Sequence, residues 1–87
     1  MSERRGSIRQ YKSEDIDILV RLPKLLEIHG RLVDLSSSGF RAVHMYPELS
    51  AGQKIEFKRE GSEGTALVVW NCIFAEHVET GFFILHD

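Results

Sequence analysis

The feature that most constrains this chain of 87 residues is an alternation of apolar and other side chains with a period of two. The clearest instance begins at residue 16, where every second residue is a large aliphatic one: Ile16, Ile18, Val20 and Leu22. Successive side chains of a β-strand point to opposite faces, whereas an amphipathic helix repeats every 3.6 residues. No segment sustains a helical period, and the nearest candidate, residues 22–28, is short and contains Pro23. We therefore expect an all-β protein.

Glycine, proline and serine residues divide the chain into six predicted strands. These strands cover residues 16–22, 26–34, 40–45, 54–58, 66–74 and 81–85. Gly30 indicates a bulge in the second strand. The strand 66–74 is apolar on both faces, which is typical of the most buried strand of a sheet. Short strands with frequent turns predict a small antiparallel barrel or sandwich, and closing the sheet into a barrel removes its exposed edges.

The two ends of the chain differ from the predicted barrel. Residues 1–15 carry almost no apolar side chain apart from Ile8 and Tyr11, so burial cannot offset the entropy lost on ordering them. We therefore divide the chain into a flexible arm, residues 1–15, and a single barrel domain, residues 16–87. The sequence ends just after the last predicted strand, and we expect no substantial C-terminal helix.

Charge and composition exclude several classes of protein. A net charge of −2 argues against a protein that coats long nucleic acids, because such binding needs many cationic contacts to phosphate. No apolar stretch is long enough to span a bilayer, and the polar start lacks the core of a signal peptide, so we expect a cytoplasmic protein without membrane insertion. The single cysteine, Cys72, leaves no internal disulfide to form and is expected to be buried as a small hydrophobe.

Groups that could support catalysis or metal binding are scattered along the sequence. The four histidines have no metal-ligand spacing and are interpreted as strand or turn residues: His29, His44, His77 and His86. No nucleophile with a paired base is evident, so we expect neither an enzyme nor a cofactor. The large aromatic side chains are assigned to the core, with the lining of a ligand groove as the alternative for Trp70: Phe57, Trp70, Phe74 and Phe83.

Two short motifs have the residue types needed to bind an anion. The first, Arg5-Gly6-Ser7-Ile8-Arg9, places two arginines four residues apart on the polar arm. The second, Asp34-Leu35-Ser36-Ser37-Ser38-Gly39, lies where a predicted strand enters a turn. Taken singly, paired arginines on an arm are solvated charge. The second motif alone is a turn whose polar side chains bond nearby backbone and whose glycine adopts a positive φ angle.

Together and in this order, the two motifs resemble the PilZ family, which is marked by Arg-x-x-x-Arg followed by Asp/Asn-x-Ser-x-x-Gly. The strand containing Val68, Val69 and Trp70 and the final Gly81-Phe82-Phe83 strand also look like the closing strands of that family. The resemblance covers nearly the whole chain. It implies a six-stranded antiparallel barrel that binds cyclic di-GMP, a bacterial second messenger.

The resemblance also implies a set of binding residues: Arg5, Arg9, Asp34, Ser36 and Gly39. Arg4, directly before the first motif, corresponds to an arginine associated with binding a stacked pair of ligand molecules, or is a solvated charge. Gly81 corresponds to a glycine near the bound base, or has a packing role. An arginine fork matches the O6 and N7 acceptors of guanine and the phosphates, while a carboxylate can accept from the N1 and N2 donors.

The polar arm suggests how such a receptor would signal. The arginines of the arm would close over the ligand and against the barrel, and a downstream protein would bind the altered surface. The main alternative is a PilZ-like adaptor that binds proteins but not the nucleotide. A more distant alternative is a small RNA-binding barrel, which should carry basic and aromatic residues on exposed strands. The sequence leaves open the partner and whether the protein is a monomer or a dimer.

Overall fold

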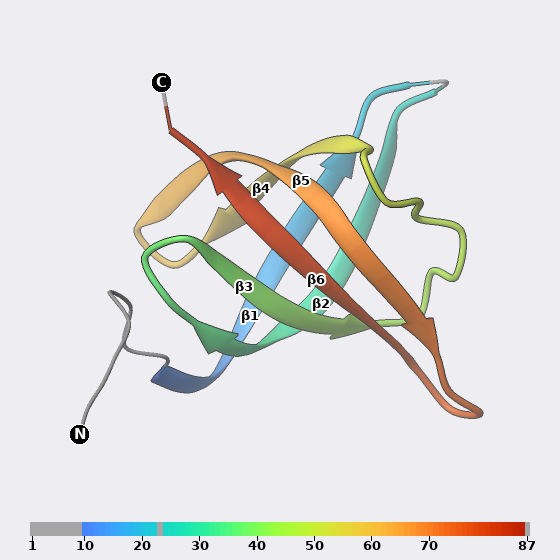
Figure 1. Ribbon diagram of the computed structural model, residues 1–87, viewed down its shortest axis with the longest axis horizontal. Helices are drawn as coiled ribbons and strands as arrows, with labels where there is room; N and C mark the ends of the chain where they lie inside the picture. Colours follow the sequence, from blue (N-terminus) through green and yellow to red (C-terminus); the bar gives the residue numbers. More distant parts are fainter. Residues whose placement is uncertain (1–9, 23, 87) are drawn as a thin grey trace.

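The computed structural model describes residues 10–22 and 24–86, with side chains from Glu14 onward (Figure 1). Six antiparallel strands close into one barrel in the order β1-β2-β3-β6-β5-β4. The strands are β1 (Gln10–Val20), β2 (Leu26–Leu35), β3 (Gly39–His44), β4 (Lys54–Arg59), β5 (Ser62–Ile73) and β6 (Val78–Leu85). The predicted all-β, six-stranded barrel is therefore confirmed. The described part of the chain has no helix that is long and apolar enough to cross a membrane.

The barrel begins earlier in the chain than the side-chain pattern indicated. β1 starts at Gln10, which pairs with Leu35, so residues 10–15 belong to a strand rather than to the arm. Backbone pairing with β2 extends this strand beyond the alternating segment, and such pairing needs no apolar side chain. The predicted arm residues 1–9 lie outside the described residues.

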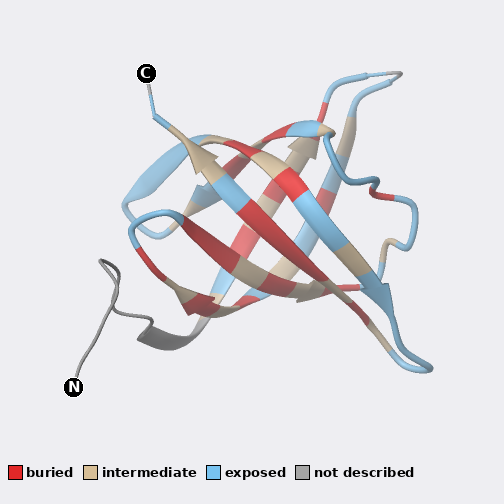
Figure 2. Ribbon diagram, in the orientation of Figure 1, coloured by how far each residue is buried: buried red, intermediate tan, exposed pale blue. Residues whose placement is uncertain are grey.

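Buried residues occur on all six strands (Figure 2), and apolar ones among them form the core of the barrel. The ring of Phe40 is central, because it stacks on Phe82 with centroids 4.7 Å apart and meets Phe57 edge-on at 5.0 Å. Burial of large aromatic side chains supplies much of the stability of so small a domain. The other buried apolar residues of this core are Ile16, Ile18, Val20, Ile28, Leu32, Ala42, Leu49, Ile55, Ala66 and Val68.

The structure corrects the role predicted for Gly30. This residue pairs in regular register with Ile16, and it is not a bulge. A Cβ atom at Gly30 would lie 2.7 Å from the backbone oxygen of Val43, so the glycine allows β2 and β3 to approach closely. The register shifts fall elsewhere, between Tyr11 and Glu14, between Leu32 and Asp34, and between Val68 and Trp70.

The burial predicted for the second half of β5 and for two nearby aromatic residues is wrong. Trp70 and Cys72 on β5, Phe74 just after it and Phe83 on β6 are exposed rather than buried. Phe57 on β4 is buried as expected. Only the inner face of β5 meets the core, because no second layer in the described structure covers the outer face of the barrel. The bulge at Val69 also turns two consecutive side chains, Val69 and Trp70, toward solvent.

A partly buried chain of hydrogen bonds fixes the loop between β3 and β4. The Nδ1 atom of His44 accepts from the backbone N–H of Tyr46 at 3.1 Å, so Nε2 carries the proton of the neutral ring. That Nε2 lies 2.7 Å from the Thr80 hydroxyl, which donates to Asn71 Oδ1, while Asn71 Nδ2 donates to the backbone oxygen of Pro47. Burial lowers the pKa of His44 from its ordinary value. The folded state therefore favours a neutral imidazole.

This network predicts a specific pH dependence of stability. Between the lowered pKa of the folded state and the ordinary value of 6.5, the unfolded chain binds the His44 proton more readily. The contribution of His44 is present above pH 6.5 and is lost as the pH falls toward the folded-state pKa. Urea unfolding from pH 8 to pH 5 should therefore show a steeper loss of stability in the wild type than in His44→Gln.

The matched control is His29→Gln. The carboxylate of Asp17 raises the pKa of His29, first by a hydrogen bond and then by its charge. A raised pKa gives stability below pH 6.5 that is lost as the pH rises, so the difference between wild type and this variant should have the opposite slope. Equal slopes for wild type and His44→Gln would show that folding does not lower the pKa of His44.

Candidate functional site

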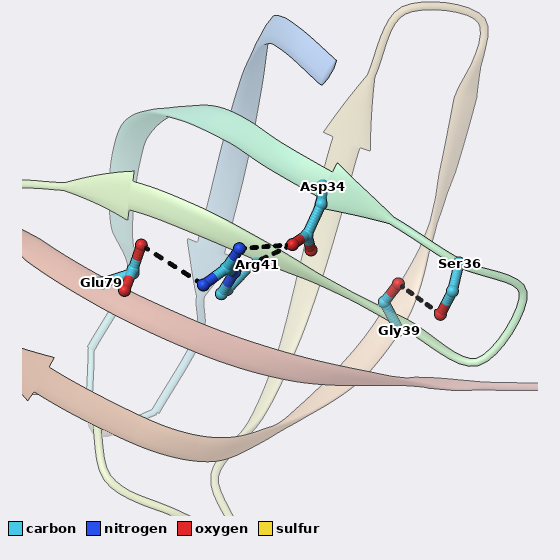
Figure 3. Close-up of polar contacts among 5 residues, drawn as sticks. All are labelled: Asp34, Ser36, Gly39, Arg41 and Glu79. Atoms are coloured by element: carbon cyan, nitrogen blue, oxygen red, sulfur yellow. Dashed lines mark hydrogen bonds and ion pairs between the residues drawn. The ribbon is translucent and has the colours of Figure 1, made fainter. Parts of the chain in front are cut away.

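The Asp34–Gly39 motif forms the tight connection between β2 and β3. The backbone N–H of Ser36 donates to the Gly39 oxygen at 2.9 Å, and the Ser36 hydroxyl donates to the same oxygen at 3.3 Å. The N–H of Ile84 donates to the Ser38 oxygen at 2.8 Å, which ties the turn to β6. Ser36 is buried, and its bonds to Gly39 close the turn; Figure 3 shows the bond from the hydroxyl.

Gly39 is required for space rather than for its backbone angle. A Cβ atom there would lie 2.2 Å from the backbone oxygen of Phe82 on the neighbouring strand β6. The positive φ angle expected at Gly39 is not observed, and the described glycines that adopt one are Gly52 and Gly61. The turn is closed by Ser36, so Gly39 already has strand geometry and pairs with Phe83.

Asp34 is completely buried and forms an ion pair with Arg41 (Figure 3). Arg41 Nη2 and Nε donate to the same Asp34 oxygen, Oδ2, at 2.6 Å and 3.0 Å. A buried carboxylate needs a charged partner to offset its lost hydration. Sequence analysis missed Arg41, although the hairpin register offered a signal, because the turn places residue 41 opposite residue 34.

Gly81 leaves room for the indole ring of Trp70 to pack against the backbone of β6. Trp70 and Gly81 are register partners on β5 and β6, and a Cβ atom on Gly81 would lie 2.4 Å from the Nε1 and Cε2 atoms of the indole. The bulge at Val69 brings Trp70 to the outer face, where its ring covers the Gly81 backbone. The packing role weighed for Gly81 is therefore observed, and contact with a base stays a prediction.

These residues surround an open groove of about 400 Å³ across β3, β5 and β6, which we call the Arg41 groove. Its lining includes Arg41, whose side chain is partly exposed, and the partly exposed aromatic residues Trp70 and Phe83. Aromatic faces can stack on nucleobases, and guanidinium donors can meet phosphate or guanine acceptors. The lining residues are Asp34, Ser38, Gly39, Phe40, Arg41, Val69, Trp70, Gly81, Phe82 and Phe83.

Of the predicted site residues, the structure brings together Asp34, Gly39 and Gly81 in the groove, with Ser36 in the adjoining turn. The predicted Arg4, Arg5 and Arg9 lie outside the described residues. The first described residue after them, Gln10, pairs with Leu35, between Asp34 and Ser36. The chain thus enters the barrel beside the Asp34–Gly39 motif.

A second polar cluster lies on the outer face of β1 and β2. Strand register places Asp17 opposite His29, and their side chains are joined by a 2.6 Å contact between Oδ1 and Nδ1. Ligand atoms of Asp17, Glu27 and His29 lie within 4.8 Å of one another. Spacing along the sequence gave no sign of this grouping, because its members come from two strands. An exposed ion pair accounts for the short contact without a metal ion.

The barrel is similar to a solved structure, the PilZ domain with c-di-GMP of YcgR from Escherichia coli. The two share 19% sequence identity with a TM-score of 0.67, over 97% of this chain and 79% of the other. No family model matches the sequence, and no curated protein matches it either. The chain therefore has a PilZ-like fold, as the two sequence motifs implied.

The close approach at Gly39 can be tested by substitution. Gly39→Ala should destabilise the barrel by about 1–3 kcal/mol, because the new methyl group meets backbone that cannot rotate away. Ser38→Ala, at the neighbouring exposed position, should change stability by no more than about 0.5 kcal/mol. Urea denaturation measures both. Equal stabilities for the two variants would show that β3 and β6 are not so close at this point.

Proposed function

We propose that this protein is a receptor for cyclic di-GMP and that the ligand binds in the Arg41 groove. The observation that carries the proposal is the coincidence of three features at one place. The groove is lined by residues of the Asp34–Gly39 motif and by exposed aromatic residues. The arginine-bearing segment joins β1 beside that motif. The PilZ-like fold supports the same assignment, since the similar YcgR domain was solved with c-di-GMP.

The chemistry of the ligand matches the groove and the arm. Cyclic di-GMP is a dianion with two guanines, so it needs cationic donors for its phosphates and flat surfaces for its bases. Arg5 and Arg9 supply planar guanidinium forks, and Trp70 supplies an exposed aromatic face in the groove. Gly39 also lines the groove. Arg4 would add a further cation for a second, stacked ligand molecule.

We further propose that binding orders the segment before β1 and creates a surface for a partner protein. The ligand would supply the contacts that the polar sequence of residues 1–9 does not provide by itself. Large apolar side chains near the groove, Val69 and Phe83, are about half exposed and could form part of the surface that a partner recognises.

Two other functions remain as outcomes of the test. The exposed apolar side chains of β5 and β6 suit an adaptor that binds proteins without the nucleotide. The exposed rings of Trp70 and Phe83 suit stacking on single-stranded RNA, although the net charge of −2 opposes it.

Titration calorimetry with cyclic di-GMP, GTP and a short RNA discriminates among the three functions. Selective binding of the cyclic dinucleotide supports the receptor, RNA binding supports the RNA-binding barrel, and no binding supports the adaptor.

The arginine motif should contribute strongly to affinity. Arg5→Ala or Arg9→Ala should each weaken cyclic di-GMP binding by about 1–3 kcal/mol, the value of a bidentate contact to guanine. The control is Arg21→Ala, which removes an exposed arginine paired with Glu56 away from the groove and should leave affinity nearly unchanged. Calorimetry that gives wild-type affinity for both arm variants would refute their role.

Ordering of the N-terminal segment makes a separate prediction. Amide hydrogen exchange of residues 1–9 should slow when cyclic di-GMP saturates the protein, because new hydrogen bonds protect the backbone. Amides in the middle of β4, such as that of Phe57, serve as an internal reference, since they are already paired within the barrel. Unchanged exchange of residues 1–9 at saturation would mean that binding does not order this segment.

A further inference from the structure

Three charged side chains from the neighbouring strands β2, β3 and β6 lie close together beside the groove (Figure 3). The guanidinium of Arg41 lies between the carboxylates of Asp34 and Glu79. Asp34 on β2 is the register partner of Arg41 on β3, and Glu79 on β6 is the partner of Val43, two residues further along β3. Glu79 is therefore a diagonal neighbour of Arg41, a spacing that long side chains can bridge.

The two carboxylates hold Arg41 very differently. Asp34 is fully buried and accepts from Nε and Nη2, with the shorter contact at 2.6 Å. Glu79 Oε2 lies 3.9 Å from Nη1, too far for a hydrogen bond, and its side chain is 21% exposed. The contact with Asp34 thus fixes the direction of the guanidinium, whereas the contact with Glu79 is a loose electrostatic one that an incoming anion can replace.

The carboxylate of Glu79 lies close to Arg41, at the side of the groove where an anionic ligand would meet the guanidinium. A negative charge at this position opposes the binding of an anion. Unlike Asp34, Glu79 does not line the groove. Its charge therefore acts on a bound dianion mainly by repulsion and by attracting Nη1 away from it.

We infer that Arg41 is a further ligand-binding residue and that Glu79 is an internal competitor that weakens binding of the dianion. This inference rests on the proposed function and adds to it. Asp34 holds the guanidinium through Nε and Nη2. When the ligand enters, Nη1 exchanges its loose contact with Glu79 for a hydrogen bond to a phosphate or guanine acceptor. Glu79 then sets how much ligand is needed to fill the site.

Glu79→Gln gives the most direct test, because it removes the charge and keeps the shape of a side chain that makes no short contact with Arg41. Calorimetry should show cyclic di-GMP binding about 3- to 10-fold more tightly, as expected for losing one like charge at a partly screened distance. Glu60→Gln, the same change in the exposed turn between β4 and β5, is the matched control and should leave affinity unchanged. The gain should shrink as salt is raised, which a purely structural effect would not do.

The complementary variants change the guanidinium itself. Arg41→Gln should weaken binding about 10-fold or more, and Arg41→Lys should restore part of the affinity by keeping the charge without the fork. Because Arg41→Gln leaves the buried Asp34 carboxylate without this partner, thermal unfolding must confirm that it folds. If it does not, the pair Asp34→Asn with Asp34→Asn/Arg41→Gln removes that charge and isolates the effect of Arg41 on affinity.

The outcomes separate this inference from the proposed function. Wild-type binding together with equal affinities for Glu79→Gln and Glu60→Gln overturns the competitor role and leaves the receptor function standing. Wild-type binding that a folded Arg41→Gln variant retains in full overturns the role of Arg41. A wild-type protein that does not bind cyclic di-GMP overturns both the function and the inference.

Discussion

The geometry of the groove depends on the ion pair between Asp34 and Arg41. A carboxylate with no exposed surface loses its hydration, and two guanidinium donors on a single oxygen offset that loss. The pair joins β2 to β3 beside the tight turn that Ser36 closes. It thereby fixes the direction of the arginine on which the electrostatics of the groove depend. Removing Arg41 alone would leave the buried Asp34 carboxylate without this partner.

Irregular pairing shapes the site around that ion pair. One register shift falls between Leu32 and Asp34, and another falls between Val68 and Trp70. Bulges re-aim side chains and increase the local twist of a strand, and they are common beside binding sites. Here the second bulge turns Trp70 over Gly81, so that an aromatic face borders the groove instead of entering the core.

The sequence predicted the barrel well because period-two alternation and turn residues directly reflect strand geometry. The sequence also predicted the turn at Asp34–Gly39, because short polar side chains and glycine favour turns in the backbone next to them. It did not predict the exposure of Trp70 and Phe83, because hydrophobicity alone does not tell which face of a curved sheet is covered. It also missed Arg41, whose importance arises only when register places it opposite Asp34. The positive φ angle expected for Gly39 was wrong, since space rather than backbone angle requires a glycine there.

Closure of the barrel limits how another protein can recognise it. In the described structure each strand is hydrogen-bonded to a neighbour on both sides over at least part of its length. Little strand edge is therefore left to accept an additional strand from a partner. Recognition then relies mainly on side chains and on the loops at the two ends, and a change of bound state would reach a partner through what those surfaces display.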